Sequence, residues 1–185
     1  MESWHRAESI YPKGYAAPDA SICHKKLTIG RHLYLGKGVL IYQDHNGAQV
    51  RLDDGVHIHD NTVLQTGSDG EILIGAGTHI QPRCQFSAYM GAIKIGRNVE
   101  IGPCCAFYSY NHGIAADKPV REQPLETKGG IEIEDEAWLG YGVIVLDGVH
   151  IGKGAIIGAG SVVTHDIPEN SVATGIPARI IKTRE

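Results

Sequence analysis

Aliphatic residues or phenylalanine recur six positions apart through most of the chain. They run from Ile29 to Val163 and end in the unbroken series Ile133, Leu139, Val145, Ile151, Ile157 and Val163. A spacing of six fits neither the 3.6-residue period of a helix nor the simple alternation of one long strand. Each six-residue unit is therefore predicted to be a short β-strand followed by a turn.

Two further positions of the unit strengthen this prediction. Glycine follows the aliphatic residue at eight places, where a chain that bends repeatedly benefits from a residue without a side chain. Four positions after the aliphatic residue, a small or branched residue recurs, as at Val39, Thr62, Val99 and Ser161. If both sets point inward, stacked coils bury a continuous apolar column that no single unit can bury, as in a solenoid.

The repeat resembles the hexapeptide repeat of the left-handed parallel β-helix acyltransferases, and the resemblance covers about residues 29–182. It implies an all-β, left-handed parallel β-helix with three hexapeptides per triangular coil, an exception to the usual right-handed crossover. It also implies a homotrimer with active sites between neighbouring β-helices. Residues 1–28 do not show the repeat, so we expect them to form an N-terminal extension to one β-helix domain.

The segment SYNHGIAADKPVREQPLETKGG (109–130) interrupts the repeat. His112 has the phase of an outward side chain, and Gly113 stands where the next aliphatic residue is expected. Loops of this length in compact domains are usually functional or mobile. An inserted loop is therefore predicted at about residues 113–130, with His112 at its base.

Within the family, the segment from Asn111 to the GIPARII motif is most similar to the sugar and xenobiotic O-acetyltransferase branch. That resemblance implies that His112 is the catalytic general base and that Asn111 lies beside the acceptor. An imidazole suits acetyl transfer, because the acceptor loses a proton and the thiolate gains one near neutral pH. The branch often has asparagine where Cys104 stands, so a contact to the acceptor or intermediate at Cys104 differs here.

The motif DEAWLGYGVIVL resembles the D-x-W-I/L-G unit that follows the loop in the same branch. The resemblance implies that the Trp138 indole lies near the catalytic histidine and the acyl end of CoA. From the residues alone, Trp138 fits equally an outward tryptophan buried between subunits. Both interpretations remain open.

The C-terminal segment IGAGSVVTHDIPENSVATGIPARIIK closely resembles the end of the family's β-helix. The resemblance implies acetyl-CoA as co-substrate, with its arm along small residues and its phosphates near basic ones. The residues predicted to bind CoA are Gly140, Gly142, Ala159, Gly160, Thr164, Ile176, Pro177, Arg179 and Lys182. The alternative is a cap that closes the last coil and carries two solvated charges.

Charge and composition exclude several partners. The 17 Lys and Arg residues and 21 Asp and Glu residues give a formal net charge of -4, which disfavours nucleic acid and anionic membrane surfaces. The sequence has no signal-peptide h-region and no apolar run that would span a bilayer, so we expect a cytoplasmic protein. The four cysteines lack zinc-ribbon spacing, and no metal is expected. Cys84 and Cys105 have the inward phase of inert core residues.

Two other functions remain open on the same scaffold. His57 and His59 flank the inward Ile58 and face outward together, as two ligands of one metal would, which allows a γ-type zinc carbonic anhydrase. That family's close histidine pair five residues apart is not evident, and Trp138 and the loop would have no role in it. A non-catalytic trimeric scaffold is the other possibility, and it would have no affinity for CoA.

The function favoured by the residues and the resemblance is an acetyl-CoA-dependent O-acetyltransferase that uses direct attack on the thioester. His112 takes the proton of the acceptor hydroxyl, and backbone amides hold the oxyanion. Acetylation of an amino sugar nitrogen is the nearest alternative. The sequence does not identify the acceptor, which we expect to be a sugar or a related small molecule, or the group that orients His112.

Overall fold

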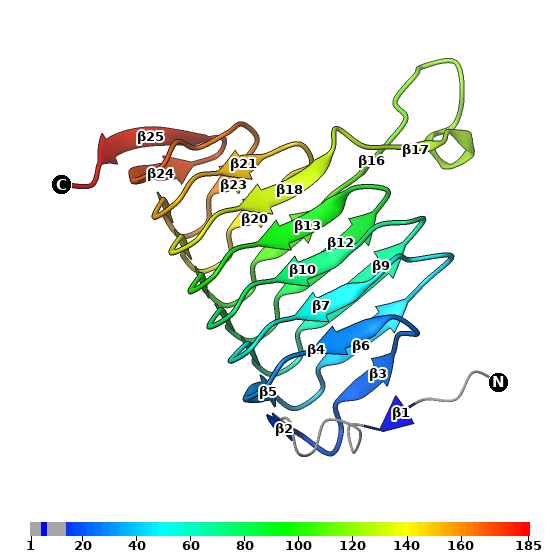
Figure 1. The fold of residues 1–185 in the computed structure, drawn as a ribbon. Helices are drawn as coiled ribbons and strands as arrows, with labels where there is room; N and C mark the ends of the chain where they lie inside the picture. Colours follow the sequence, from blue (N-terminus) through cyan, green and yellow to red (C-terminus); the bar gives the residue numbers. More distant parts are fainter. Residues whose placement is uncertain (1–4, 7–13) are drawn as a thin grey trace.

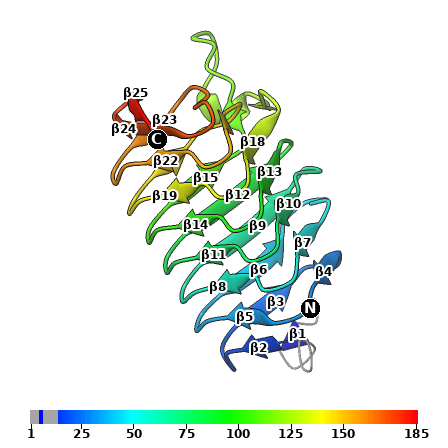
Figure 2. The ribbon, with the colours of Figure 1, turned by 60° about the vertical axis from the view of Figure 1, so that its left-hand side comes forward.

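The chain winds as a triangular solenoid whose three faces are β-sheets of stacked parallel strands, two of which end in an antiparallel strand (Figures 1 and 2). The computed structural model describes residues 5–6 and 14–185. Successive coils pass in the same order through a nine-stranded, an eight-stranded and a six-stranded face. The predicted all-β, left-handed parallel β-helix is confirmed.

Short strands build all three faces. The nine-stranded face contains, in spatial order, β2 (Gly14–Ala16), β5 (Leu33–Leu35), β8 (His57–Ile58), β11 (His79–Ile80), β14 (Glu100–Ile101), β19 (Trp138–Leu139), β22 (Ile156–Ile157), β24 (Ser171–Gly175) and β25 (Ala178–Thr183). The eight-stranded face contains β1 (His5–Arg6), β3 (Ser21–Cys23), β6 (Leu40–Gln43), β9 (Val63–Gly67), β12 (Gln85–Tyr89), β15 (Ala106–Tyr108), β20 (Ile144–Val145) and β23 (Val162–Val163). The six-stranded face contains β4 (Leu27–Ile29), β7 (Val50–Leu52), β10 (Ile72–Ile74), β13 (Ala92–Ile95), β18 (Gly130–Ile133) and β21 (His150–Ile151).

The predicted inward positions form the core. The residues of the six-residue spacing are buried from Leu35 to Val163, and Ile29 packs against them half-buried. The second set of inward positions is buried as well, including the polar Thr78. Its hydroxyl donates a hydrogen bond to the Gly96 carbonyl (2.8 Å), so the polar group keeps a partner inside the column.

Like residues stack from coil to coil inside the column. The rings of Phe86 and Phe107 lie in successive coils with their centroids 4.4 Å apart. Cys84 and Cys105 are buried at the inward position that the sequence indicated. The neighbouring Cys105 thiol and burial raise the pKa of Cys84. A protonated, inward-facing Cys84 is not a nucleophile.

The β-helix begins earlier than the sequence indicated. Residues 14–28 are not an extension, because β2, β3 and β4 form a coil that pairs in parallel with β5, β6 and β7. The spacing conceals this coil: alanine stands six residues before the buried Ile22, and Ile29 follows it by seven. The rest of the predicted extension, residues 1–4 and 7–13, lies outside the described residues.

The excursion after β15 leaves the coil and returns to the same register. β13 pairs in parallel with β18, so that Ala92 lies opposite Gly130 and Ile95 opposite Ile133. Within the excursion, β16 (Asn111–His112) and β17 (Leu125–Glu126) pair antiparallel around the short 3₁₀ helix η2 (Val120–Glu122). The excursion projects well beyond the stacked coils in both views (Figures 1 and 2). Among the described residues, no helix is long and apolar enough to cross a membrane.

Candidate active site

His112 lies on β16 at the base of the excursion, in the position that the sequence predicted. It pairs with Leu125 across the hairpin, and the Gly113 N–H donates to the Pro124 carbonyl (3.0 Å), which holds the two ends of the excursion together. The His112 side chain is exposed, and its ring meets the Tyr110 ring edge-on with centroids 6.4 Å apart. Within residues 14–185 its ring nitrogens have no hydrogen-bond partner, so both are open to a ligand.

A buried aspartate ties the excursion to the coil. Asp147, only 5% exposed, accepts hydrogen bonds from the backbone N–H groups of Lys128 (2.6 Å) and Gly130 (3.0 Å), the Thr127 hydroxyl (3.0 Å) and the Asn111 side-chain amide (3.2 Å). These bonds satisfy both carboxylate oxygens, which a buried charge requires. The amide of Asn111, predicted to contact the acceptor, thereby also fixes the strand that carries the catalytic candidate.

One glutamine orders the interior of the excursion. Gln123 Oε1 accepts a hydrogen bond from the Ala115 N–H (2.8 Å), while its Nε2 donates to the carbonyls of Ala115 and Lys118 (2.9 Å each). Asp117, Lys118 and Arg121 remain exposed around these bonds. The excursion therefore holds a defined shape and presents its charged side chains outward.

Trp138 lies on the opposite side of the β-helix from His112. It belongs to β19 of the nine-stranded face, in register with Glu100 and Ile156, and is 54% exposed. The excursion leaves from the edge between the eight- and six-stranded faces, and in a triangular coil that edge is opposite the nine-stranded face. His112 and Trp138 can therefore meet only if a second chain brings them together.

Four residues predicted to bind CoA line the edge between the nine- and eight-stranded faces. Gly142 and Gly160 occupy equivalent turn positions, and each donates its N–H to a carbonyl of the coil below (2.8 Å). Both have a positive φ (68° and 69°), and a Cβ added to either would meet nothing within 4 Å. Gly140 and Ala159 precede them in the same turns. The edge is thus an open track of backbone, which suits a narrow ligand arm.

Cys104 holds the same turn position one coil earlier. Its φ is 61°, and its side chain is half-buried. A hydrogen bond with the Cys104 thiol raises the pKa of the exposed Tyr141 hydroxyl. Within one chain, Cys104 therefore lies with the glycine edge and not beside His112.

The remaining CoA candidates lie near the end of the β-helix. Ile176 and Pro177 form the exposed turn between β24 and β25, and Arg179 and Lys182 are exposed on β25. This antiparallel hairpin covers the last coil of the nine-stranded face, so the segment is a cap as well as a candidate cofactor site. Thr164 differs from the others, because it follows β23 at the far end of the eight-stranded face from the glycine edge.

The nine-stranded face also carries the two histidines considered as metal ligands. His57 and His59 flank the buried Ile58, as predicted. The His57 ring stacks on His79 with centroids 4.6 Å apart, and partial burial together with the two neighbouring histidines lowers the pKa of His57. In residues 5–6 and 14–185, no group of three or more His, Cys, Asp or Glu is placed to hold a metal. One described chain therefore offers no ligand set for the carbonic anhydrase alternative.

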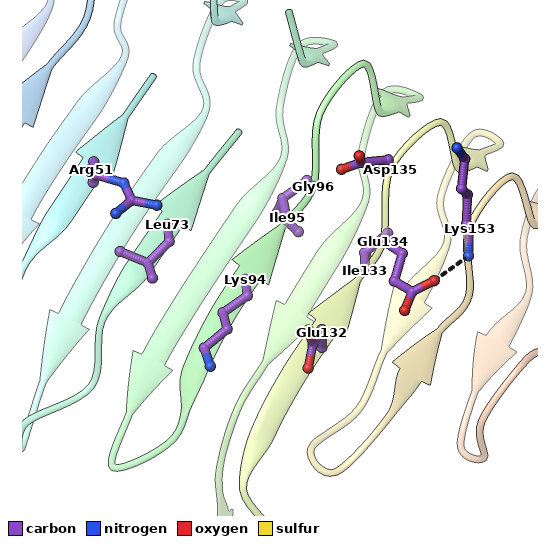
Figure 3. A pocket seen from close by; sticks show the side chains of 10 residues that line it. All are labelled: Arg51, Leu73, Lys94, Ile95, Gly96, Glu132, Ile133, Glu134, Asp135 and Lys153. Carbon is purple, nitrogen blue, oxygen red and sulfur yellow. Dashed lines mark hydrogen bonds between the residues drawn. The ribbon is translucent and has the colours of Figure 1, made fainter. Parts of the chain in front are cut away.

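An open hollow of about 390 Å³ on the six-stranded face contains none of the predicted site residues. Figure 3 shows Arg51 and Lys94 toward one side of it and Glu132, Glu134 and Lys153 toward the other. The Lys153 N–H donates to Glu134 Oε2 (2.7 Å). Because charges of both signs alternate across it, the hollow has the character of a solvated face.

Residues 130–165 match the family described as "Bacterial transferase hexapeptide (six repeats)". This segment is similar to the hexapeptide repeats of that family. The matched residues run from β18 through β23, where the six-residue spacing is unbroken.

Curated proteins similar to part of this chain include proteins named as acetyltransferases. A putative acetyltransferase of Schizosaccharomyces pombe is 51% identical over 69 residues, which are 37% of this chain and 33% of that protein. The galactoside O-acetyltransferase of Lactococcus lactis is 48% identical over 69 residues, 37% of this chain and 32% of that protein. The match thus spans about a third of the length of these relatives.

Solved structures of similar fold include an acyltransferase. A variant of AntD, an N-acyltransferase from Bacillus cereus in complex with dTDP and coenzyme A, has a TM-score of 0.62 and 22% identity. The similarity covers 100% of this chain and 92% of AntD. At this identity it supports the β-helical fold.

The sequence did not reveal Asp147 or Tyr110 as site residues. Asp147 stands in an ordinary LDG turn, and its role appears only when the excursion folds back onto it. Tyr110 lies two residues before His112, so strand alternation places both side chains outward. This alternation is the sequence signal that could have identified Tyr110.

Proposed function

We propose that the chain is an acetyl-CoA-dependent O-acetyltransferase that acts as a homotrimer. The observation that carries this proposal is an exposed imidazole, His112, held at the base of an ordered excursion with both ring nitrogens open. The open glycine edge and Trp138 lie elsewhere on the chain, where a neighbouring subunit would complete the site. The names of the curated relatives support acetyl transfer.

Direct attack accounts for the roles of the residues. His112 removes the proton from the acceptor hydroxyl as its oxygen attacks the thioester carbonyl carbon. Backbone N–H groups stabilise the negative charge on the thioester oxygen. The carbon–sulfur bond then breaks, and the protonated imidazole returns the proton to the leaving CoA thiolate. Asn111 and Cys104 contact the acceptor or intermediate from their respective chains, and Trp138 packs at the acyl end of CoA.

The CoA arm follows the glycine edge. Gly142 and Gly160 leave open space along the turns, and Gly140 and Ala159, which pack closely on each other in adjacent coils, lie beside them. The terminal hairpin supplies Ile176 and Pro177 at adenine and Arg179 and Lys182 at the phosphates. Thr164, directly after β23, supplies the last contact.

The outward residues of the faces support a trimer. The nine-stranded face presents Tyr15 and Trp138, each 54% exposed, whereas the six-stranded face presents Arg51, Lys94 and Glu132. Interfaces are enriched in aromatic residues, and charged residues are depleted at their centres. The nine-stranded face is therefore the better surface for a neighbouring subunit.

A hydroxyl of a sugar is the proposed acceptor. The galactoside O-acetyltransferase of L. lactis supports it by name. Transfer to the nitrogen of an amino sugar is the second candidate, because the fold is shared with the N-acyltransferase AntD.

The test combines ligand-dependent thermal unfolding with a transfer assay. A ligand that binds the native state raises its apparent stability, so acetyl-CoA and CoA are expected to raise the melting temperature, whereas zinc and EDTA leave it unchanged. Transfer from acetyl-CoA to galactosides, other sugars and amino sugars is followed by mass spectrometry, which distinguishes ester from amide products. His112→Ala is expected to lower kcat by about 10³-fold or more while keeping the acetyl-CoA shift.

His32→Ala is the matched control, because His32 is an exposed histidine at a turn on the nine-stranded side of the first coils. Absence of any acetyl-CoA shift, or full transfer by His112→Ala, contradicts the proposal. If the assay yields only amide products, the activity is N-acetyl transfer and the proposed O-acetyl transfer is wrong.

A further inference from the structure

A polar aromatic surface leads away from His112 across four coils. We name it the tyrosine strip and define it as Tyr42, Asp44, Gln65, Tyr89, Tyr108 and Tyr110. Its residues belong to β6, β9, β12 and β15 of the eight-stranded face or follow them within two residues. The strands lie on successive coils, at the edge from which the excursion projects (Figure 1).

The register places these side chains in two neighbouring rows. In one row, Tyr42 lies opposite Gln65, Gln65 opposite Ser87, and Ser87 opposite Tyr108. Ser87 is buried, so this row has a low point between Gln65 and Tyr108. In the next row, nearer the excursion, Tyr89 lies opposite a glycine, Gly67.

Hydrogen bonds hold the centre of the strip. The Tyr89 hydroxyl donates to Asp44 Oδ2 (2.7 Å) and accepts from Gln65 Nε2 (2.7 Å). The ring lies over Gly67, because a Cβ at that position would come within 2.3 Å of it. A side chain at position 67 would therefore displace the Tyr89 ring. The hydrogen bonds and this close packing fix the ring in place without a ligand.

The strip carries a carboxylate and no cation. The hydrogen bond from Tyr89, together with that from the His45 N–H, lowers the pKa of Asp44, so its side chain is ionised at neutral pH. That side chain is 41% exposed and keeps lone pairs for a ligand hydroxyl. The strip thus offers hydrogen-bond acceptors and aromatic faces to a ligand, and its six residues include no cation to bind an anionic group.

The strip is continuous with the catalytic candidate. Tyr89 and Tyr110 have ring centroids 5.0 Å apart, and Tyr110 and His112 have centroids 6.4 Å apart. A molecule lying along the strip therefore ends at the imidazole.

We propose that the tyrosine strip binds a neutral oligosaccharide and presents its terminal sugar to His112. The C–H faces of sugars pack on tyrosine rings, while their hydroxyls hydrogen-bond to carboxylate and amide groups such as those of Asp44 and Gln65. Four coils spaced about 4.8 Å apart span about 14 Å, which matches about three sugar units. This inference rests on the proposed acetyl transfer and specifies its acceptor.

The experiment compares sugars that differ only in length. Galactose and galactotriose, glucose and maltotriose, and N-acetylglucosamine and chitotriose are titrated into the CoA-saturated protein by saturation-transfer NMR. In at least one series, the trisaccharide is expected to bind about tenfold more tightly than the monosaccharide. Asp44→Ala and Tyr42→Ala, which change the strip far from His112, are each expected to lower this ratio about fivefold.

Lys94→Ala is the control, because Lys94 is exposed on β13 of the six-stranded face, away from both the strip and the proposed subunit interface. The ratio of trisaccharide to monosaccharide affinity in this variant should equal that of the wild type. The proposal is overturned if no trisaccharide binds better than its monosaccharide, if both strip variants keep the ratio, or if they lower it only by changing the oligomeric state in gel filtration.

The acetyl-CoA thermal shift separates this proposal from the one on which it rests. If trisaccharides bind better than monosaccharides but acetyl-CoA does not raise the melting temperature, the proposed transferase is refuted and the proposed oligosaccharide site stands. If acetyl-CoA raises the melting temperature but trisaccharides bind no better than monosaccharides, the proposed transferase stands and the proposed oligosaccharide site is refuted.

Discussion

At the scale of single residues, Asp147 does the most to shape the candidate site. Its carboxylate gathers groups from β16, from the end of the excursion and from the start of β18. A buried carboxylate with several N–H partners is strongly held, and its loss leaves those donors without partners. The geometry around His112 therefore depends on a residue that need not touch substrate.

Asp147→Asn is expected to loosen the excursion. An amide accepts through one oxygen only and turns its NH₂ toward backbone N–H donors, which costs about 2–4 kcal/mol locally. Trypsin should then cut after the exposed Arg121 at least tenfold faster than in the wild type. Asp166→Asn is the control, because Asp166 is exposed and accepts one backbone hydrogen bond, from His150 (2.8 Å). Equal cleavage of the Asp147 and Asp166 variants would contradict the role of Asp147.

At the scale of elements, the turn between two faces decides what the edge can hold. Equivalent positions carry Gly38, then Asn61, Arg83 and Cys104 in the three coils before the excursion, and Gly142 and Gly160 after it, all with a positive φ. The Asn61 side chain covers Gly38, so side chains fill the edge before the excursion, whereas nothing lies over Gly142 and Gly160. The change coincides with the coils that follow the excursion.

Gly160→Asn is expected to fill the edge at little cost in stability. Asparagine tolerates a positive φ, as Asn61 does in the equivalent turn at 58°. Gly160→Val adds strain of about 1–2 kcal/mol at the same site. In calorimetry, both variants should bind acetyl-CoA at least tenfold more weakly than the wild type. In urea unfolding, only Gly160→Val should lose about 1–2 kcal/mol of unfolding free energy. Wild-type affinity in Gly160→Asn would place the CoA arm elsewhere.

The sequence predicted the elements well and the site only in part. The inward set from Leu35 to Val163 follows directly from the spacing, because each inward residue contributes independently to one column. The first coil was missed, because alanine and a seven-residue step conceal the period around Ile22. Asp147 and Tyr89 were missed for another reason: their partners lie 17 to 45 residues away, and only the coil register brings them together.

At the scale of the whole molecule, one chain divides the candidate machinery between opposite sides. The edge with His112 is opposite the face with Trp138, and the glycine edge lies beside that face. A closed cyclic assembly would place the histidine of each chain against the glycine edge of the next, and it would repeat the same complete site at each interface.

Mixed assemblies are expected to recover activity that neither parent has. His112→Ala and Gly160→Asn are co-expressed in equal amounts, so that a complete site needs an intact histidine from one chain and an intact edge from its neighbour. Random mixing then restores about a quarter of the wild-type sites. Each variant expressed alone, and the two mixed after separate purification without exchange, provide the baselines. Activity no higher than these baselines would show that one chain forms its own site.

The antiparallel strands at the two ends of the stack have a separate consequence. A column of parallel strands can in principle lengthen without limit, since its last coil offers the same unpaired backbone that the coil before it offered. β25 runs antiparallel to β24 at one end, and β1 runs antiparallel to β3 at the other. A second copy that stacked end to end would meet strands of the wrong direction on these two sheets. The same short antiparallel strands at the two ends of the stack thus oppose its growth into a fibre.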